Sequence, residues 1–273
     1  MGFSGDVTIK EILVSNFISH EPCPKCGSRD NLGIYDDGHQ FCFGCKYYKP
    51  GEERKYSKSV VKRLNAQAPD WQLPSDFSDI LGDPAVAWLH KYDLDPFVAH
   101  KYNFGWSSSR QRLICRLYMG GRYVGYQARN FEAGPKYLTR YNPEYKDKHV
   151  YYLPYADTPV LVLVEDIISA IKIHLAGYNV IALMGSFLKP HIRDFILNLG
   201  RHMYVFPWLD PDKTLEGNKI KNEMELYGYK SDHIVSSQDP KDYSISKIQE
   251  TVDLCISWIH DELYRDAGES RDD

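Results

Sequence analysis

Features that mark membrane or exported proteins are missing from this chain of 273 residues. No apolar run approaches the ~18 residues needed to span a bilayer. The first residues lack the basic segment followed by an apolar one that a leader peptide requires. Internal repeats are also missing, and a composition of 43% hydrophobic and 26% charged residues excludes wholesale disorder and a collagen-like chain. The sequence predicts a globular cytoplasmic protein with no membrane partner.

Cysteine is scarce, with six residues, but four of them lie close together. Cys23 and Cys26 form one Cys-x-x-Cys pair, and Cys42 and Cys45 form a second pair after fifteen intervening residues. Two such pairs offer the tetrahedral sulfur ligands that a closed structural zinc site prefers. Two disulfides are the alternative, which nothing in the sequence supports because no export signal is visible. The isolated cysteines are expected to be buried hydrophobic residues: Cys115 and Cys255.

The net charge of −4 hides an uneven distribution of charge. Residues 101–150 contain ten Lys or Arg and three acidic residues, so this stretch carries +7. The same stretch contains ten aromatic residues. Basic side chains bind phosphates and aromatic rings stack on unpaired bases, although a solvated face and ordinary core packing would also explain them. The pattern indicates a surface that meets an anion.

After residue 159, short apolar runs alternate with helical patterns, which predicts an α/β fold with a parallel sheet covered by helices. Glycines follow the helical patterns at the positions where helices end. The expected strands are 160–164, 180–184, 203–206 and 233–235, the expected helices between them are 166–175, 189–199 and 214–227, and a further helix is expected at 246–264.

Acidic residues follow three of these expected strands. Glu165 follows the first, Asp210 and Asp212 follow the third, and Asp239 follows the fourth. Parallel strands bring their carboxyl ends to one edge, where ligands bind in such sheets. Carboxylates without His or Cys suit Mg²⁺, whose other ligands are water and phosphate oxygens. Each acid alone could be a helix N-cap, but together they predict a magnesium site.

The order of several motifs resembles the zinc-ribbon plus Toprim DNA primases of bacteria and tailed phages. The resemblance covers most of the chain, from about Cys23 to Asp242. A zinc ribbon alone is shared by many families, whereas a zinc ribbon followed by PKYL and then by Glu before Asp-x-Asp is specific. The matching segments are CPKCGSRDN from Cys23, DGHQFCFGC from Asp37, GRYVGYQAR from Gly121, PKYL from Pro135, Glu165 after Val164, MGS from Met184 and LDPD from Leu209.

This resemblance implies a DNA-directed RNA polymerase that copies single-stranded DNA into short RNA primers from ribonucleoside triphosphates. Glu165, Asp210 and Asp212 would be catalytic, with Glu165 near the metals or acting as general acid and base. The ligands of Mg²⁺ or Mn²⁺ would be Glu165, Asp210, Asp212 and Asp239. Nucleotide and template would be held by Arg122, Arg129 and Lys136, and the zinc domain would recognise template through residues among Arg29, Asp30, Asn31, His39 and Phe41.

The resemblance also implies a domain order and partners. No helicase domain is visible, so the chain resembles a stand-alone phage primase that works with a separate replicative helicase in the host cytoplasm. The expected segments are a zinc-binding domain at 1–50, a basic linker at 51–75, a basic N-terminal subdomain of the polymerase core at 76–157, a parallel-sheet Toprim subdomain at 158–245, and a C-terminal helix with an acidic tail at 246–273.

One position departs from the Toprim pattern Glu-Gly-x-x-Asp. Asp166 stands in place of the Gly, and Ser169 stands in place of the Asp. Ser169 lies one helical turn after Glu165, so its hydroxyl is expected to face the site, but without charge. Two alternatives therefore stay open: a Toprim nuclease or topoisomerase fragment with the same acidic edge, and a non-catalytic single-strand-binding adaptor of the replisome.

Overall fold

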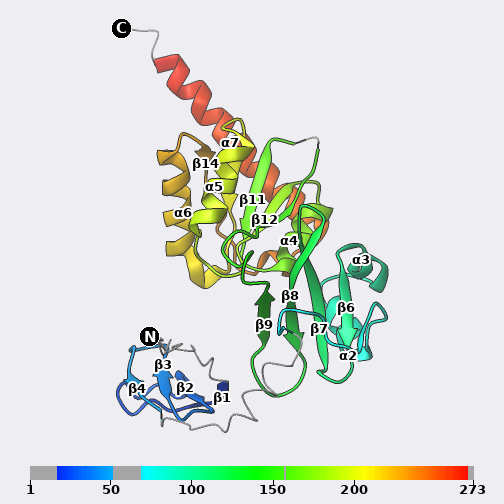
Figure 1. Cartoon of the computed structure of the whole chain (residues 1–273). Helices are drawn as coiled ribbons and strands as arrows, with labels where there is room; N and C mark the ends of the chain where they lie inside the picture. Colours follow the sequence, from blue (N-terminus) through cyan, green and yellow to red (C-terminus); the bar gives the residue numbers. More distant parts are fainter. Residues whose placement is uncertain (1–16, 52–68, 157, 270–273) are drawn as a thin grey trace, which may run out of the picture. The chain divides into compact units, whose positions relative to one another are not determined.

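Two compact units, Met1–Ala68 and Pro69–Asp273, divide the chain in the computed structural model shown in Figure 1. The structure describes residues 17–51, 69–156 and 158–269, with side chains up to residue 259. None of the helices within these ranges has the length and apolar character that crossing a bilayer requires.

The first unit is a small antiparallel sheet with strand order β1-β2-β3-β4, formed by Phe17–Glu21, Leu32–Tyr35, Gln40–Cys42 and Tyr48–Lys49. Each Cys-x-x-Cys turn ends on a residue with a left-handed backbone, Gly27 at φ 70° and Lys46 at φ 62°. The amide of Gly27 donates to the carbonyl of Cys23, and the amide of Lys46 donates to that of Cys42. The two turns are therefore built alike, and glycine adopts this conformation without the steric cost that lysine bears.

The second unit begins with an antiparallel sheet of order β5-β6-β7-β8-β9. Much of the basic segment forms its central hairpin, β7 and β8, whose middle residues are buried on both faces of the sheet. Helices α2 (Asp83–His90) and α3 (Pro96–Lys101) precede β6. The strands are β5 (Phe77–Ser78), β6 (Phe104–Ser107), β7 (Arg112–Met119), β8 (Arg122–Asn130) and β9 (Tyr137–Tyr141).

Part of the expected linker at 51–75 packs against this sheet. The hydroxyl of Tyr123 donates to the carbonyl of Trp71 at 2.8 Å, and the guanidinium of Arg140 pairs with Asp70 at 2.9 Å. The second unit thus starts earlier than residue 76, because these polar contacts, together with the packing of Trp71 on Tyr123 and of Leu73 on the buried cluster at Ile114, fix this stretch. The remainder of the linker prediction falls on residues 52–68, which lie outside the described residues.

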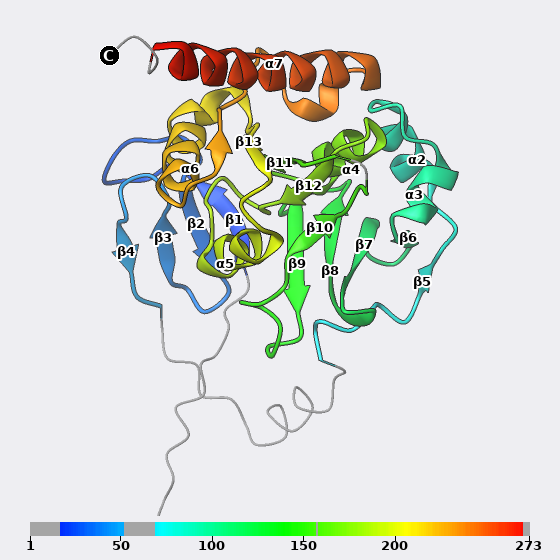
Figure 2. The ribbon, with the colours of Figure 1, turned by 90° about the horizontal axis from the view of Figure 1, so that it is seen from above.

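The chain then forms the expected α/β layer, with strand order β10-β12-β11-β13-β14 and only β10 antiparallel. Apolar residues of helices α5 and α6 pack on one face of the sheet, and those of α4 and α7 pack on the other (Figure 1). Figure 2 shows α7 as one long helix, and its contacts include α4. The strands are β10 (Tyr151–Leu153), β11 (Val160–Val164), β12 (Asn179–Ala182), β13 (Tyr204–Pro207) and β14 (Lys230–Ser231). The helices are α4 (Ile167–Leu175), α5 (Pro190–Leu199), α6 (Thr214–Leu226) and α7 (Ile245–Glu269), with 3-10 turns η1 (Pro211–Lys213) and η2 (Pro240–Asp242).

The predicted fourth strand at 233–235 is wrong. The strand paired to β13 is β14, three residues earlier, and their ladder consists of Tyr204 opposite Lys230 and Val205 opposite Ser231. Ile234 contributes one backbone bond, from its amide to the Pro207 carbonyl at 2.9 Å. Asp239 therefore reaches the sheet edge on a loop. The glycines expected to end helices, by contrast, have left-handed φ values of 99° at Gly177 and 83° at Gly228.

Candidate active site and zinc centre

The four clustered cysteines meet at one point of the first unit. Their sulfur atoms lie within 4.8 Å of one another, with 3.7 Å between Cys23 and Cys45 and 3.8 Å between Cys26 and Cys42. Four thiolates about 2.3 Å from a tetrahedral Zn²⁺ would lie about 3.8 Å apart, whereas a disulfide is about 2.0 Å long. The cysteines are free thiols, and hydrogen bonding to Ser28 lowers the pKa of Cys26 to about 6. The predicted four-cysteine site is confirmed, and the set of donors fits zinc.

The opposite face of this sheet carries aromatic side chains. Leu32 and Cys42 pair across β2 and β3 and belong to the small core around the cysteines, so the alternating residues face the other way. Phe41 meets Phe43 edge to face at 5.2 Å, and Phe43 is half exposed. We call this set the aromatic face: Phe17, His20, Tyr35, Phe41 and Phe43.

The zinc-unit residues expected to recognise template differ in their surroundings. The His39 ring stacks on Tyr35 with centroids 4.0 Å apart, and its Nδ1 lies 2.7 Å from a carboxylate oxygen of Asp37. Phe41 belongs to the aromatic face, and the ammonium of Lys46 lies 5.9 Å from its ring centroid. Arg29 is exposed on the loop before β2. The structure thus places a histidine and a phenylalanine from the sequence prediction beside further aromatic rings that the prediction did not include.

In the second unit, a cavity of about 470 Å³ brings together most of the residues predicted to form the catalytic site. Its volume lies within the ~300–1,000 Å³ usual for ligand sites. Carboxylates from the ends of β11 and β13 line one part, and cations from β8 and the loop before β9 line another. The predicted residues in its wall are Arg129, Lys136, Glu165, Asp210 and Asp239, and those that do not line it are Arg122 and Asp212.

Glu165 and Asp210 form the acidic centre of this cavity. The backbone amide of Asp210 donates to Glu165 Oε1 at 3.1 Å, which locks the two strand ends together. Asp210 Oδ1 is buried without a hydrogen-bond partner. Burial and the neighbouring Asp210 raise the pKa of Glu165; burial also raises the pKa of Asp210, with Asp239 and Asp166 adding to the rise against the opposing charge of Lys241. Two carboxylates that repel each other, one with an orphaned oxygen, fit a divalent cation.

Helix capping does not explain Asp210 or Asp239. Both residues flank 3-10 turns, and neither side chain makes a capping hydrogen bond. The cap in this region is Asp166, whose Oδ1 accepts from the amides of Ile168 and Ser169 at 2.9 and 3.0 Å. The N-cap alternative therefore applies to Asp166, the residue at the position of the Toprim glycine.

Ser169 does not face the cavity as expected. Its side chain is fully buried, and its hydroxyl donates to Asp166 Oδ2 at 2.9 Å. Asp166 accepts the first-turn amides of α4 with one oxygen and this hydroxyl with the other, so the hydroxyl points to the start of the helix. Ser169 acts on the site only through Asp166, which does line the cavity.

Asp212 and Arg122 point to other partners. The Asp212 carboxylate is 72% exposed and pairs with the ammonium of Lys213, which lowers the pKa of Asp212. Arg122 begins β8, and its Nη1 donates to the hydroxyl of Tyr145 at 2.9 Å. Seven residues of extended strand, about 23 Å, separate Arg122 from Arg129. The structure therefore does not bring either residue to the cavity.

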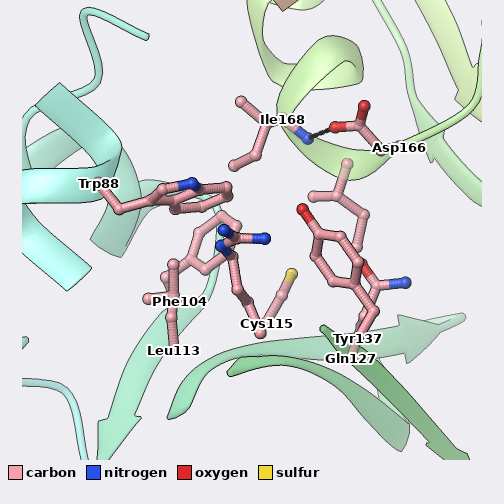
Figure 3. Close-up of a pocket in the computed structure, with 10 residues that line it drawn as sticks. Trp88, Phe104, Leu113, Cys115, Gln127, Tyr137, Asp166 and Ile168 are labelled. Carbon is pink, nitrogen blue, oxygen red and sulfur yellow. Dashed lines mark hydrogen bonds between the residues drawn. The ribbon is translucent and has the colours of Figure 1, made fainter. Parts of the chain in front are cut away.

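Arg129 occupies a cage of aromatic rings beside the acidic centre. The guanidinium carbon lies 4.4 Å from the centroid of Trp88, 5.3 Å from Tyr137 and 5.6 Å from Phe131. Its Nε and Nη1 are buried without hydrogen-bond partners. Figure 3 shows Trp88 and Tyr137 on opposite sides of an adjoining cavity of about 20 Å³, enough for about one water. A cation held by rings, with donors to spare, suits an incoming anion.

Sequence reasoning missed several residues of the cavity wall, above all Lys241. Its ammonium contacts Asp239 at 2.5 Å and Asp166 at 3.0 Å. The only sequence signal was its position in the run Asp-Pro-Lys-Asp. Met184 was quoted for its motif but not for its conformation, a left-handed φ of 52°, which places it in the wall with its sulfur 3.2 Å from the hydroxyl of Tyr141. Tyr92, Gln127 and Thr139 also line the cavity.

Comparison with known proteins gives a short match in sequence and a broad one in structure. No family model matches the chain. A DNA helicase/primase of Enterobacteria phage T3 is 41% identical over 49 residues, which are 18% of this chain and 9% of the phage protein. The chain thus matches only a small part of that protein's length.

Solved structures with a similar fold are primase domains. The zinc-binding and RNA polymerase domains of the Aquifex aeolicus primase are 16% identical, with 90% of this chain and 81% of that one covered and a TM-score of 0.53. A DnaG primase catalytic domain bound to ssDNA is 15% identical, with 72% and 77% covered and a TM-score of 0.52. The chain has the fold of a primase zinc-binding domain joined to a primase polymerase core, as the resemblance in sequence implied.

Proposed function

We propose that this chain is a DNA primase that makes short RNA primers on single-stranded DNA by metal-dependent nucleotidyl transfer. The observation that carries the proposal is the cavity in which Glu165 and Asp210 face Arg129 and Lys136. Phosphoryl transfer needs carboxylates to hold a divalent cation and basic groups to hold phosphates, and this cavity offers both. The primase fold and the matching segment of a phage helicase/primase support it.

Glu165 and Asp210 are the proposed ligands of Mg²⁺ or Mn²⁺. The orphaned Oδ1 of Asp210 and the raised pKa values of both carboxyl groups support this placement. Asp239 adds negative charge to the same wall, whereas Asp212 is occupied by Lys213. When bound there, the cation would supply Lewis-acid activation of the primer 3′-hydroxyl and stabilise the leaving pyrophosphate.

Arg129 and Lys136 are the proposed contacts to the nucleotide triphosphate. Arg129 carries a guanidinium that the cage of Trp88 and Tyr137 holds in place, so little side-chain entropy is lost when its free N–H groups bind phosphate oxygens. Lys136 lies directly before β9 and carries a mobile charge to the same cavity. Arg122, at the far end of β8, is proposed to contact template phosphates away from the reacting centre.

The zinc unit is the proposed reader of the template. Unpaired bases stack on exposed rings, and the aromatic face offers Phe41 and Phe43, with His39 stacked on Tyr35; Arg29 is an exposed cation of the same unit. The four-cysteine centre would hold one structural Zn²⁺ and so fix the sheet that carries these rings. The separate replicative helicase stays a prediction from the resemblance.

Primer synthesis on single-stranded templates that cover all trinucleotides tests the proposal. With Mg²⁺ and labelled ribonucleoside triphosphates, we expect RNA oligomers whose yield depends on the template trinucleotide. Glu165→Gln is the control and is expected to abolish them while single-strand binding persists. Shortened template DNA would instead identify a nuclease, and binding without any product would identify an adaptor; either result would overturn the proposal.

A further inference from the structure

Among the residues that the structure describes, Lys241 is the lysine that pairs with two carboxylates of the cavity wall. Its side chain is 13% exposed, and its contacts are Asp239 Oδ2 at 2.5 Å and Asp166 Oδ2 at 3.0 Å. One of these acids comes from the start of α4 and the other from η2, and Asp166 lies 75 residues before Lys241 in the chain. The ammonium therefore joins two elements at the wall of the cavity.

The anchoring leaves few alternative positions for the ammonium. Asp166 is itself fixed, because its other oxygen caps α4 through two backbone amides. The hydroxyl of Ser169 donates to the same Oδ2 that contacts Lys241. A carboxylate with this many donors cannot turn toward a metal ion without uncapping the helix.

We propose that the ammonium of Lys241 takes the position that a second divalent cation would need at the wall of this cavity. The site then holds one divalent cation, between Glu165 and Asp210. The inference rests on the proposed nucleotidyl-transfer function, because it concerns the metal content of that same site.

Charge and geometry carry this inference. In two-metal sites the cations lie about 3.5–4 Å apart and share carboxylates between them. Here Asp239 and Asp166 each give one oxygen to Lys241. The carboxylates of the wall without a lysine contact in the described structure are then Glu165, Asp210 and the exposed Asp242, and the first two are joined by the bond from the Asp210 amide to Glu165. A second divalent cation near Asp239 would also meet the positive charge of Lys241 at close range.

Titration of the zinc-loaded full chain with Mn²⁺, followed by the electron paramagnetic resonance signal of free Mn²⁺, tests the inference without using activity. We expect about one Mn²⁺ per wild-type chain and about two in Lys241→Gln, because Asp166 and Asp239 lose their cation. Lys241→Arg keeps the charge and should stay at about one. Lys213→Gln removes a lysine that pairs with Asp212 at the same edge and should also stay at about one.

Two Mn²⁺ in the wild type would overturn the inference, and this measurement does not depend on how any variant folds. A folded Lys241→Gln with one Mn²⁺ would overturn it as well. Failure of the proposed function gives a different result, since Asp210→Asn would then bind Mn²⁺ like the wild type and the wild type would make no primers.

Discussion

Replacement of Asp210 by Asn separates a catalytic carboxylate from a structural one, because the two roles predict opposite changes in stability. Asp210 carries a buried oxygen without a partner, beside the carboxylate of Glu165. Asn has nearly the same shape without the charge. We expect Asp210→Asn to reduce primer synthesis by at least ~100-fold and to raise the melting temperature of the second unit in the absence of divalent cations.

The expected stabilisation follows from the loss of the charge. Asn keeps a polar atom at that position, so the cost of the unpaired atom remains, but the buried charge and its repulsion by Asp239 and Asp166 are removed; these outweigh the attraction of Lys241, and the gain should be about 1 kcal/mol. For a unit of this size, 1 kcal/mol shifts the melting temperature by about 2–4 °C. Because the folded-state pKa of Asp210 lies above its ordinary 3.8, the folded state binds the proton more tightly. Stability is therefore lost as pH rises through the folded-state pKa, and the gain from Asn should be larger at pH 7 than at pH 4.

Thermal melting with and without Mg²⁺, run beside the primer assay, measures both effects. Mg²⁺ should stabilise the wild type by mass action and leave Asp210→Asn unchanged. Asp212→Asn is the matched control for melting, because that carboxylate is 72% exposed and its loss should change stability by less than about 0.5 kcal/mol. If Asp210→Asn melts lower than the wild type and still makes primers, the reasoning is refuted and Asp210 is a structural residue.

The other predictions concern separate parts of the chain. Cys42→Ser should remove stoichiometric zinc, measured by elemental analysis, and unfold the first unit, while the circular dichroism melt of the second unit persists; template-selective initiation should then be lost, with extension of an annealed primer partly retained. Arg129→Ala should weaken nucleotide binding about 10-fold or more and reduce the slope of binding against salt concentration, and an unchanged slope would contradict the phosphate contact. Burial lowers the pKa of His149 to about 4 from 6.5, so the unfolded chain binds the proton at a higher pH than the folded chain does. The free energy of unfolding should therefore fall by up to about 3 kcal/mol as pH drops from 6.5 to 4, and urea melts should show a smaller fall for His149→Gln.

Local sequence patterns determined the four-cysteine centre of the first unit and most elements of the parallel sheet in the second. Four cysteines in two tight pairs define a sulfur cage, since a Cys-x-x-Cys turn brings both sulfurs together by backbone geometry alone. Apolar runs and glycines placed the first three expected strands and the helices of the parallel sheet, because hydrophobic periodicity and left-handed caps are local properties. The convergence of Glu165 and Asp210 also followed, since parallel strands deliver their ends to one edge.

Only the tertiary structure decided which of these side chains face the cavity. Asp212 lies two residues after Asp210 in the sequence, yet its carboxylate is exposed and held by Lys213. Asp239 arrives on a loop, since the strand beside β13 ends at Ser231. Lys241 gave almost no signal, because its role depends on Asp166, 75 residues earlier in the chain. The sequence therefore determined which charges gather at this edge, while packing and hydrogen bonds between distant residues decided which of them pair with each other and which stay open to a ligand.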